Sequence, residues 1–212
     1  MTTTTYPSQI LAQRRADMGV HIIGLLLILT AGAALIIKAA QSADGPIVFA
    51  VSVYVLCALI SNLASWAYHF SPWHDRRVLL RRMDHAAIYL SITGTFTPFF
   101  IQAGTTWTLT LFGVCWGLTF VAIWKKFMDG NVKSKWSTAS YLGLGAIGLC
   151  ALPDLQDVPA QTLWYILGGA ACYVIGTAFY VRRTMAFRFA TWHMWVNFGG
   201  ISMFVGIWLA LF

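Results

Sequence analysis

The feature that most constrains this chain is a series of seven apolar runs, each about long enough to cross a bilayer. They cover residues 19–40, 47–70, 84–103, 107–124, 137–152, 162–181 and 190–212. A membrane-spanning helix needs about 20 mostly apolar residues. Apolar residues make up 58% of the 212 residues and charged residues only 10%, which is too apolar for a domain whose surface faces water. The sequence therefore predicts an all-α membrane protein, a bundle of seven transmembrane helices.

Basic residues are confined to alternate loops between these runs. All but one of the 14 Lys and Arg residues precede the first run or follow the second, fourth and sixth: Arg14, Arg15, Arg76, Arg77, Arg81, Arg82, Lys125, Lys126, Lys133, Lys135, Arg182, Arg183 and Arg188. The opposite loops hold Asp44, Asp154 and Asp157, with Lys38 nearby. By the positive-inside rule, the N-terminus is predicted to be cytoplasmic and the C-terminus outside. The net charge of +7 is thus a topology signal and not a sign of nucleic-acid binding.

The rest of the organisation is simple. Residues 1–18 are expected to form a cytoplasmic segment, and a short amphipathic element around residues 10–18 is compatible with a helix lying on the membrane surface. Residues 19–212 form one membrane domain. The four cysteines are isolated from one another, so neither a disulfide frame nor a zinc ribbon is predicted. The loops are short, and membrane lipids are the expected partners, with no soluble protein partner indicated.

Ionisable residues gather at one membrane depth, near the cytoplasmic side. His21 lies early in the first run, His69 ends the second, Asp84 begins the third, and His193 is about one turn into the seventh. Ser65 shares the helix face of His69, one turn deeper. Imidazole and carboxylate groups at one depth are suitable ligands for zinc or a similar divalent ion. The alternative for each histidine is a side chain in the headgroup zone that bonds to backbone or lipid.

Long motifs in the chain resemble one family. The run SWAYHF, followed by RRMDHAAIYLSITGTFTPFF, resembles the hemolysin III branch of the progestin and adipoQ receptor superfamily. The family pattern is S-x-x-x-H, then DH-x-x-IYL-x-x-x-GT-[YF]-TP, then a histidine motif in the seventh span. The opening MGVHIIGLLLILTAG is similar to the family's first segment. The resemblance covers nearly the whole chain and implies a multi-pass protein of the bacterial plasma membrane.

The resemblance also implies a metal site. Adiponectin receptors and alkaline ceramidases, which are related in fold, hold zinc near the cytoplasmic side with three histidines. Carried over by motif, His69 would be a zinc ligand from the second span. Asp84 would hydrogen-bond the water on the metal, or supply an oxygen ligand itself. Ser65 would support the same site from one turn deeper.

The seventh span departs from the family pattern. The family has H-x-x-x-H there, and the corresponding residues of this chain are FATWHMWV. His193 matches the second histidine, whereas Phe189 stands at the first. A register shift that pairs His193 with Asn197 is the alternative, although amides are poor zinc ligands. His21 is a further candidate for the missing ligand.

Two classes of function follow from these residues. With zinc bound at His69, His193, Asp84 and His21, the protein would hydrolyse an amide or ester of a lipid that enters from the inner leaflet. Asp84 would act as general base, and Ser65 would hydrogen-bond a ligand, the water or the developing oxyanion. In the rival class, the protein is a non-enzymatic membrane-homeostasis or lipid-sensing protein with a degenerate metal site. A cytolytic pore is less favoured, because the polar residues cluster at one end and line no continuous channel.

Overall fold

The computed structural model describes residues 5–128 and 136–212, and within them all the regular secondary structure is helical. Lys133 and Lys135, which entered the topology argument, lie outside these residues. The elements are the α-helices α1 (Leu11–Ser42), α2 (Gly45–Phe70), α3 (Arg77–Ala103), α4 (Thr106–Met128), α5 (Trp136–Leu149), α6 (Ala160–Tyr180) and α7 (Arg188–Leu211), with short 3-10 turns η1 (His74–Arg76) and η2 (Leu152–Asp154). The predicted all-α fold and its seven helices are confirmed.

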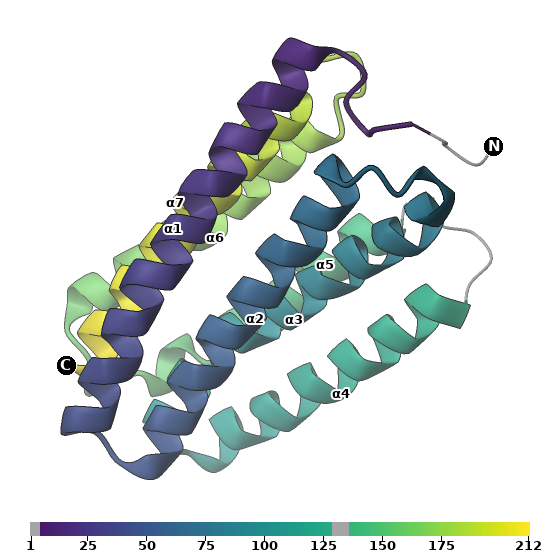
Figure 1. The fold of residues 1–212 in the computed structure, drawn as a ribbon. Coiled ribbons are helices and arrows are strands. Elements are labelled where there is room, and N and C mark those ends of the chain that lie inside the picture. The colour runs from purple at the N-terminus through teal and green to yellow at the C-terminus, as the bar shows by residue number, and fades with distance from the viewer. Residues whose placement is uncertain (1–4, 129–135) are drawn as a thin grey trace.

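The helices form a bundle in which the first and last lie side by side (Figure 1). α1 packs against α2 and α7, α7 packs against α6, and α3 packs against α2, α4 and α5. α4 lies at the outside of the bundle, far from α1 (Figure 1). Because α7 returns to α1, residues from both ends of the sequence can meet in one site.

Five of the helices, α1, α2, α4, α6 and α7, are long and apolar enough to cross a membrane. α3 is long but carries charged residues in its first turns and many buried side chains along its length, among them Phe96, Phe99 and Phe100. Its contacts with α2, α4, α5 and α7 place it inside the bundle, where it needs less lipid-facing apolar surface. α5 has 14 residues, which at about 1.5 Å per residue is shorter than the hydrocarbon core.

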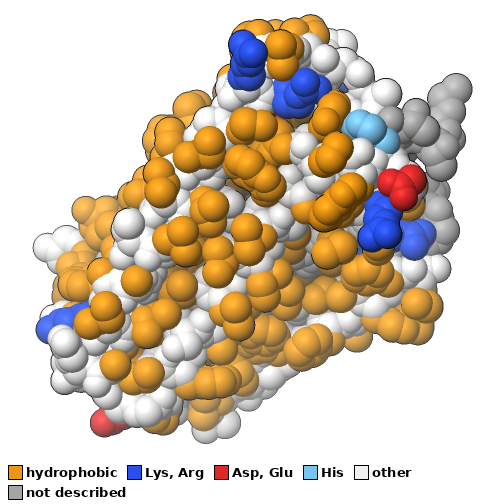
Figure 2. All heavy atoms as spheres, viewed as in Figure 1, with side chains coloured by type: hydrophobic (Ala, Val, Ile, Leu, Met, Phe, Trp, Pro, Cys, Tyr) orange, Lys and Arg blue, Asp and Glu red, His pale blue; other side chains and the backbone are white. Residues whose placement is uncertain are grey.

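The face of the bundle shown in Figure 2 carries many apolar side chains between its ends. Exposed large side chains line the helices, including Ile23 and Leu26 on α1, Phe120 on α4 and Trp164 on α6. Lys and Arg are concentrated toward the end of the bundle where α1, α3 and α7 begin (Figure 2). Such an apolar belt with charged ends is what a bilayer-embedded bundle requires.

Turn chemistry explains where some helices end. α3 stops at Gly104, whose φ of 61° closes the helix in the left-handed conformation. At the start of α2, Asp44 precedes the helix and proline occupies its first turn, where a missing N–H costs nothing. Residues 11–18, for which the sequence allows a separate surface helix, form the first two turns of α1. This continuity carries Asp17 into the bundle.

Candidate functional site

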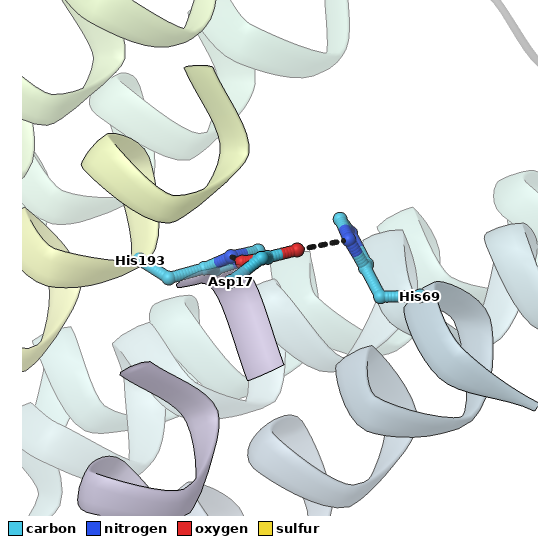
Figure 3. Close-up of side chains that lie close together, drawn as sticks. All are labelled: Asp17, His69 and His193. Atoms are coloured by element: carbon cyan, nitrogen blue, oxygen red, sulfur yellow. Dashed lines mark hydrogen bonds and ion pairs between the residues drawn. The ribbon is translucent and has the colours of Figure 1, made fainter. Parts of the chain in front are cut away.

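A buried carboxylate, that of Asp17 on α1, lies at the centre of the most polar cluster in the described bundle. Its side chain is 1% exposed, and it contacts histidines from two other helices, His69 on α2 and His193 on α7. Figure 3 shows the three side chains pointing toward one another from their separate helices. An ionised group at this depth is costly unless it is paired, so these contacts stabilise the charge.

The hydrogen bonds define the protonation of the two histidine rings. His69 donates from Nδ1 to Asp17 Oδ2 at 2.8 Å, and His193 donates from Nδ1 to Asp17 Oδ1 at 2.6 Å. A carboxylate can only accept, so both Nδ1 atoms must carry protons. In the neutral rings, each Nε2 therefore keeps a free lone pair. Such a lone pair is what a metal ion, or the proton of a reacting group, requires.

His21 lies one helical turn after Asp17 and completes the cluster. It donates from Nδ1 to the backbone carbonyl of Asp17 at 2.9 Å, which directs its Nε2 inward. Its ring centroid is 4.2 Å from that of His193 and 5.6 Å from that of His69. Three imidazoles from α1, α2 and α7 therefore converge, although they are far apart in the sequence.

Ser65 bridges two of these rings from α2. Its Oγ is 3.1 Å from His21 Nε2 and 3.4 Å from His193 Nε2. One hydroxyl has one proton, so it can donate to only one of the two acceptors at a time. The second Nε2 stays available to another partner. The structure therefore places Ser65 against His21 and His193.

Phe189 lies beside the same cluster, which supports the register inferred for α7. Its ring centroid is 4.9 Å from that of His69, in an edge-to-face arrangement. Asn197, the residue considered in the shifted register, donates to the backbone carbonyl of Val20 at 3.0 Å. This hydrogen bond connects α7 to α1.

Asp84 is not a member of the cluster. It lies half-buried on α3 and has no hydrogen bond or ion pair with any other residue that the structure describes. The ligand atoms that come within 4.8 Å of one another belong to Asp17, His69 and His193. The carboxylate predicted to serve the site is thus separate from the one found at its centre. The role of Asp84 as a general base stays a prediction.

The sequence interpretation missed Asp17 because it assigned residues 1–18 to a polar segment outside the membrane. The sequence nevertheless contains a feature that could have identified Asp17. Asp17 is one of only seven acidic residues, and it precedes His21 by four positions, which puts both on one helix face. His69 and Ser65 on α2 show the same spacing.

The cluster is chemically suited to a metal ion. Two imidazoles and a carboxylate within 4.8 Å form a donor set that zinc accepts, and His21 adds a third imidazole beside it. The alternative use of the carboxylate is as a hydrogen-bond acceptor that orients the rings, as carboxylates behind metal-bound histidines do. The group of Asp17, His69 and His193 could therefore hold a metal ion, directly or through the rings that Asp17 orients.

Comparison with known proteins agrees with the fold and the membrane setting. Residues 15–204 match the family described as haemolysin-III related. Hemolysin-3 of Bacillus cereus is 29% identical over 211 residues, covering 94% of this chain and 92% of that protein. The Hemolysin-3 homolog of Bacillus subtilis (strain 168) is 30% identical over 195 residues, covering 87% of each.

These matches extend over most of the chain, and the range of the family match includes every residue of the cluster. Together with the apolar helices, they identify a multi-pass protein of the bacterial plasma membrane, in contact with its lipids. The chain belongs to the haemolysin-III-related family.

Proposed function

We propose that this protein is a metal-dependent hydrolase of lipid amides or esters, with its site in the cytoplasmic half of the membrane. The observation that carries the proposal is the orientation of the imidazoles. Nδ1 of His69 and of His193 donates to the carboxylate of Asp17, and Nδ1 of His21 donates to its backbone carbonyl, so that Nε2 of each neutral ring is an acceptor. Ser65 lies against two of these Nε2 atoms and has one proton to donate, so the cluster has more imidazole lone pairs than it has described donors.

Asp17, His69 and His193 would hold the ion, with His21 as a further ligand. Zinc is the ion that best suits imidazole and carboxylate donors of this number. A bound zinc ion would polarise the carbonyl of the substrate and lower the pKa of a water toward 7. Phe189, at the first histidine position of the family's seventh-span motif, limits the α7 contribution to His193.

The protein's own groups would then handle the substrate and its protons. Asp84 is half-buried and, among the described residues, has no competing hydrogen bond, so its carboxylate is available as a general base. Ser65 would donate its proton to an Nε2 or to the oxygen that gains charge. The water supplies a hydroxyl to the acyl carbon and a proton to the leaving oxygen or nitrogen. The products are a fatty acid and an alcohol or amine.

The second candidate function is non-enzymatic. In this interpretation Asp17 stabilises the fold by connecting α1, α2 and α7, and the protein serves membrane homeostasis or lipid sensing. One observation favours it: both oxygens of the buried carboxylate already accept hydrogen bonds from the protein. The cluster is therefore electrostatically satisfied without an ion. The sensor would need no turnover, only a lipid-dependent change in packing.

Turnover by purified protein separates these functions. Lipids with a fluorescent acyl chain, one joined by an amide and one by an ester, are incubated with the protein in vesicles, with zinc or with a chelator. The hydrolase predicts fatty-acid release that needs zinc and is lost in His69→Ala. It also predicts that Asp84→Asn keeps the metal and loses turnover. The enzymatic proposal would be overturned if protein shown to contain zinc released no more fatty acid from either lipid than vesicles without protein do.

A further inference from the structure

Arg188, the first residue of α7, presents an unpaired cation next to the histidine cluster. Its guanidinium carbon is 4.4 Å from the centroid of the Phe189 ring and 5.5 Å from that of Tyr180. Aromatic faces attract the flat guanidinium through its face and leave its N–H edge free. The guanidinium is thus positioned by two aromatic rings, neither of which accepts its N–H groups as a carbonyl or carboxylate oxygen would.

None of those donors has a partner within the described part of the chain. Arg188 is half-buried, yet no described carboxylate or carbonyl accepts a hydrogen bond from it. A guanidinium carries five N–H donors, and a partly desolvated one is stabilised by an anion. The neighbouring Arg182 and Arg183 are exposed and add positive potential at the same end of the bundle. An acidic side chain does not fill this need.

The cation is connected to the site through one ring. Phe189 contacts Arg188 on one side and His69, at 4.9 Å between ring centroids, on the other. Tyr180 on α6 lies 6.4 Å from Phe189 by the same measure, so the rings form a continuous wall from the cation to the cluster. A molecule bound to Arg188 would extend along this wall toward His69.

The backbone before Arg188 is strained. Phe187 has a φ of 55°, and it is the one non-glycine residue with positive φ in the described ranges 5–128 and 136–212. This conformation is unfavourable for a residue with a side chain and clusters at ligand-binding sites. It turns the loop into α7 directly before the cation.

We infer that Arg188 binds the phosphate of a glycerophospholipid and so presents an acyl ester of that lipid to the histidine cluster. The inference rests on the proposed function and names its substrate class. The basic end of the bundle is where headgroup phosphates lie, and a guanidinium matches phosphate oxygens with two parallel hydrogen bonds. Phosphate and acyl esters share one glycerol, so anchoring the first places the second nearby. A ceramide, which lacks phosphate, would not use this contact.

The test is a lipid titration of the purified, delipidated protein in detergent, followed by native mass spectrometry. The ligands are phosphatidylglycerol, diacylglycerol with the same acyl chains, and glycerol 3-phosphate. Arg188→Gln is compared with Arg183→Gln, which removes the same charge from an exposed position in the same loop. Arg188→Lys retains the charge without the flat, two-pronged donor. Thermal unfolding of each variant identifies any that fail to fold.

We expect Arg188→Gln to weaken phosphatidylglycerol binding about tenfold or more and to leave diacylglycerol binding unchanged. Arg183→Gln should bind like the wild type, and Arg188→Lys should be intermediate. Equal losses in both glutamine variants, or equal binding of the two lipids by the wild type, would contradict the inference. Tight binding of glycerol 3-phosphate alone would assign the site to a soluble phosphate and also overturn it. These titrations are made in chelator, so they remain decisive even if the metal proposal fails.

Discussion

Two groups of polar residues in the described part of the bundle can be compared, because they differ in what they leave unsatisfied. The first is the histidine cluster, Asp17, His21, Ser65, His69 and His193. The second, the threonine seam, joins α3 to α4 and consists of Thr93, Thr97, Trp116 and Thr119. Both are buried and both bring side chains of different helices together.

The threonine seam is neutral and complete. Thr93 and Thr119 share a hydrogen bond of 2.7 Å between their hydroxyls, and Trp116 donates from Nε1 to Thr97 Oγ1 at 3.2 Å. Each of these polar side chains thus has an uncharged hydrogen-bond partner within the protein, which a polar group in a membrane interior needs. The histidine cluster has instead a charge, and the Nε2 atoms of His21 and His193 share one donor, the hydroxyl of Ser65. Burial of polar groups is therefore common to both, and spare ligand capacity distinguishes the cluster.

The largest effect is expected from Asp17→Asn, which removes the charge that two histidines contact. An amide can accept from one Nδ1 but opposes the other with its own N–H. We expect loss of bound metal and a fall in the free energy of unfolding of about 3 kcal/mol, because two buried hydrogen bonds to a charged group are lost or weakened. Thermal unfolding and elemental analysis measure both. Asp84→Asn, the control, should keep the metal and most of the stability.

Phe189→His is expected to strengthen the site. The new imidazole would lie beside His69, where the Phe189 ring now packs, and would restore the H-x-x-x-H pair with His193. Zinc affinity should rise about tenfold or more, because the change adds an imidazole donor to the site. Competition with a chromogenic zinc chelator measures the change. An affinity equal to that of the wild type would mean that position 189 does not reach the ion.

Ser65→Ala is expected to have a moderate effect. It removes the hydroxyl between His21 and His193 and leaves one buried acceptor without its donor. The free energy of unfolding should fall by about 1 kcal/mol, while the metal is retained. If Ser65→Ala lowers turnover while zinc content stays at the wild-type level, Ser65 acts on the substrate. Loss of zinc would instead make it part of the ligand shell.

The smallest effect is expected in the threonine seam. Thr93→Val should cost about 1 kcal/mol because it strands the Thr119 hydroxyl, whereas the double change Thr93→Val with Thr119→Val should be nearly neutral. Neither should change zinc content or turnover. If the folded double variant lost zinc, the threonine seam and the histidine cluster would be coupled. The seam could then no longer be treated as independent of metal binding.

The comparison also shows what could be predicted from the sequence. The apolar runs predicted seven helices because bilayer thickness imposes one length on each of them. Motif spacing predicted that Ser65, His69 and His193 lie together, and the structure brings them together. These properties are local or follow from topology, which is why the sequence carries them.

Asp17 required three-dimensional information. Its position near the start of α1 suggested a polar tail, and the length of that helix could not be judged from hydropathy, because charged Arg14 and Arg15 precede it. Burial of the carboxylate depends on α7 returning to α1, a contact between residues 176 positions apart. The contact between α1 and α7 is not visible in the sequence. The family motif therefore points to Asp84 as the carboxylate of the site.

The most direct test of the central claim is the zinc content of purified protein expressed with added zinc. Wild type, His69→Ala, Asp17→Asn and Thr93→Val are measured side by side by elemental analysis. We predict about one zinc per chain in the wild type and in Thr93→Val, and none in the other two variants. Zinc retained in full by Asp17→Asn and His69→Ala, or absent from the folded wild type, would contradict the claim that the Asp17 cluster is a metal site.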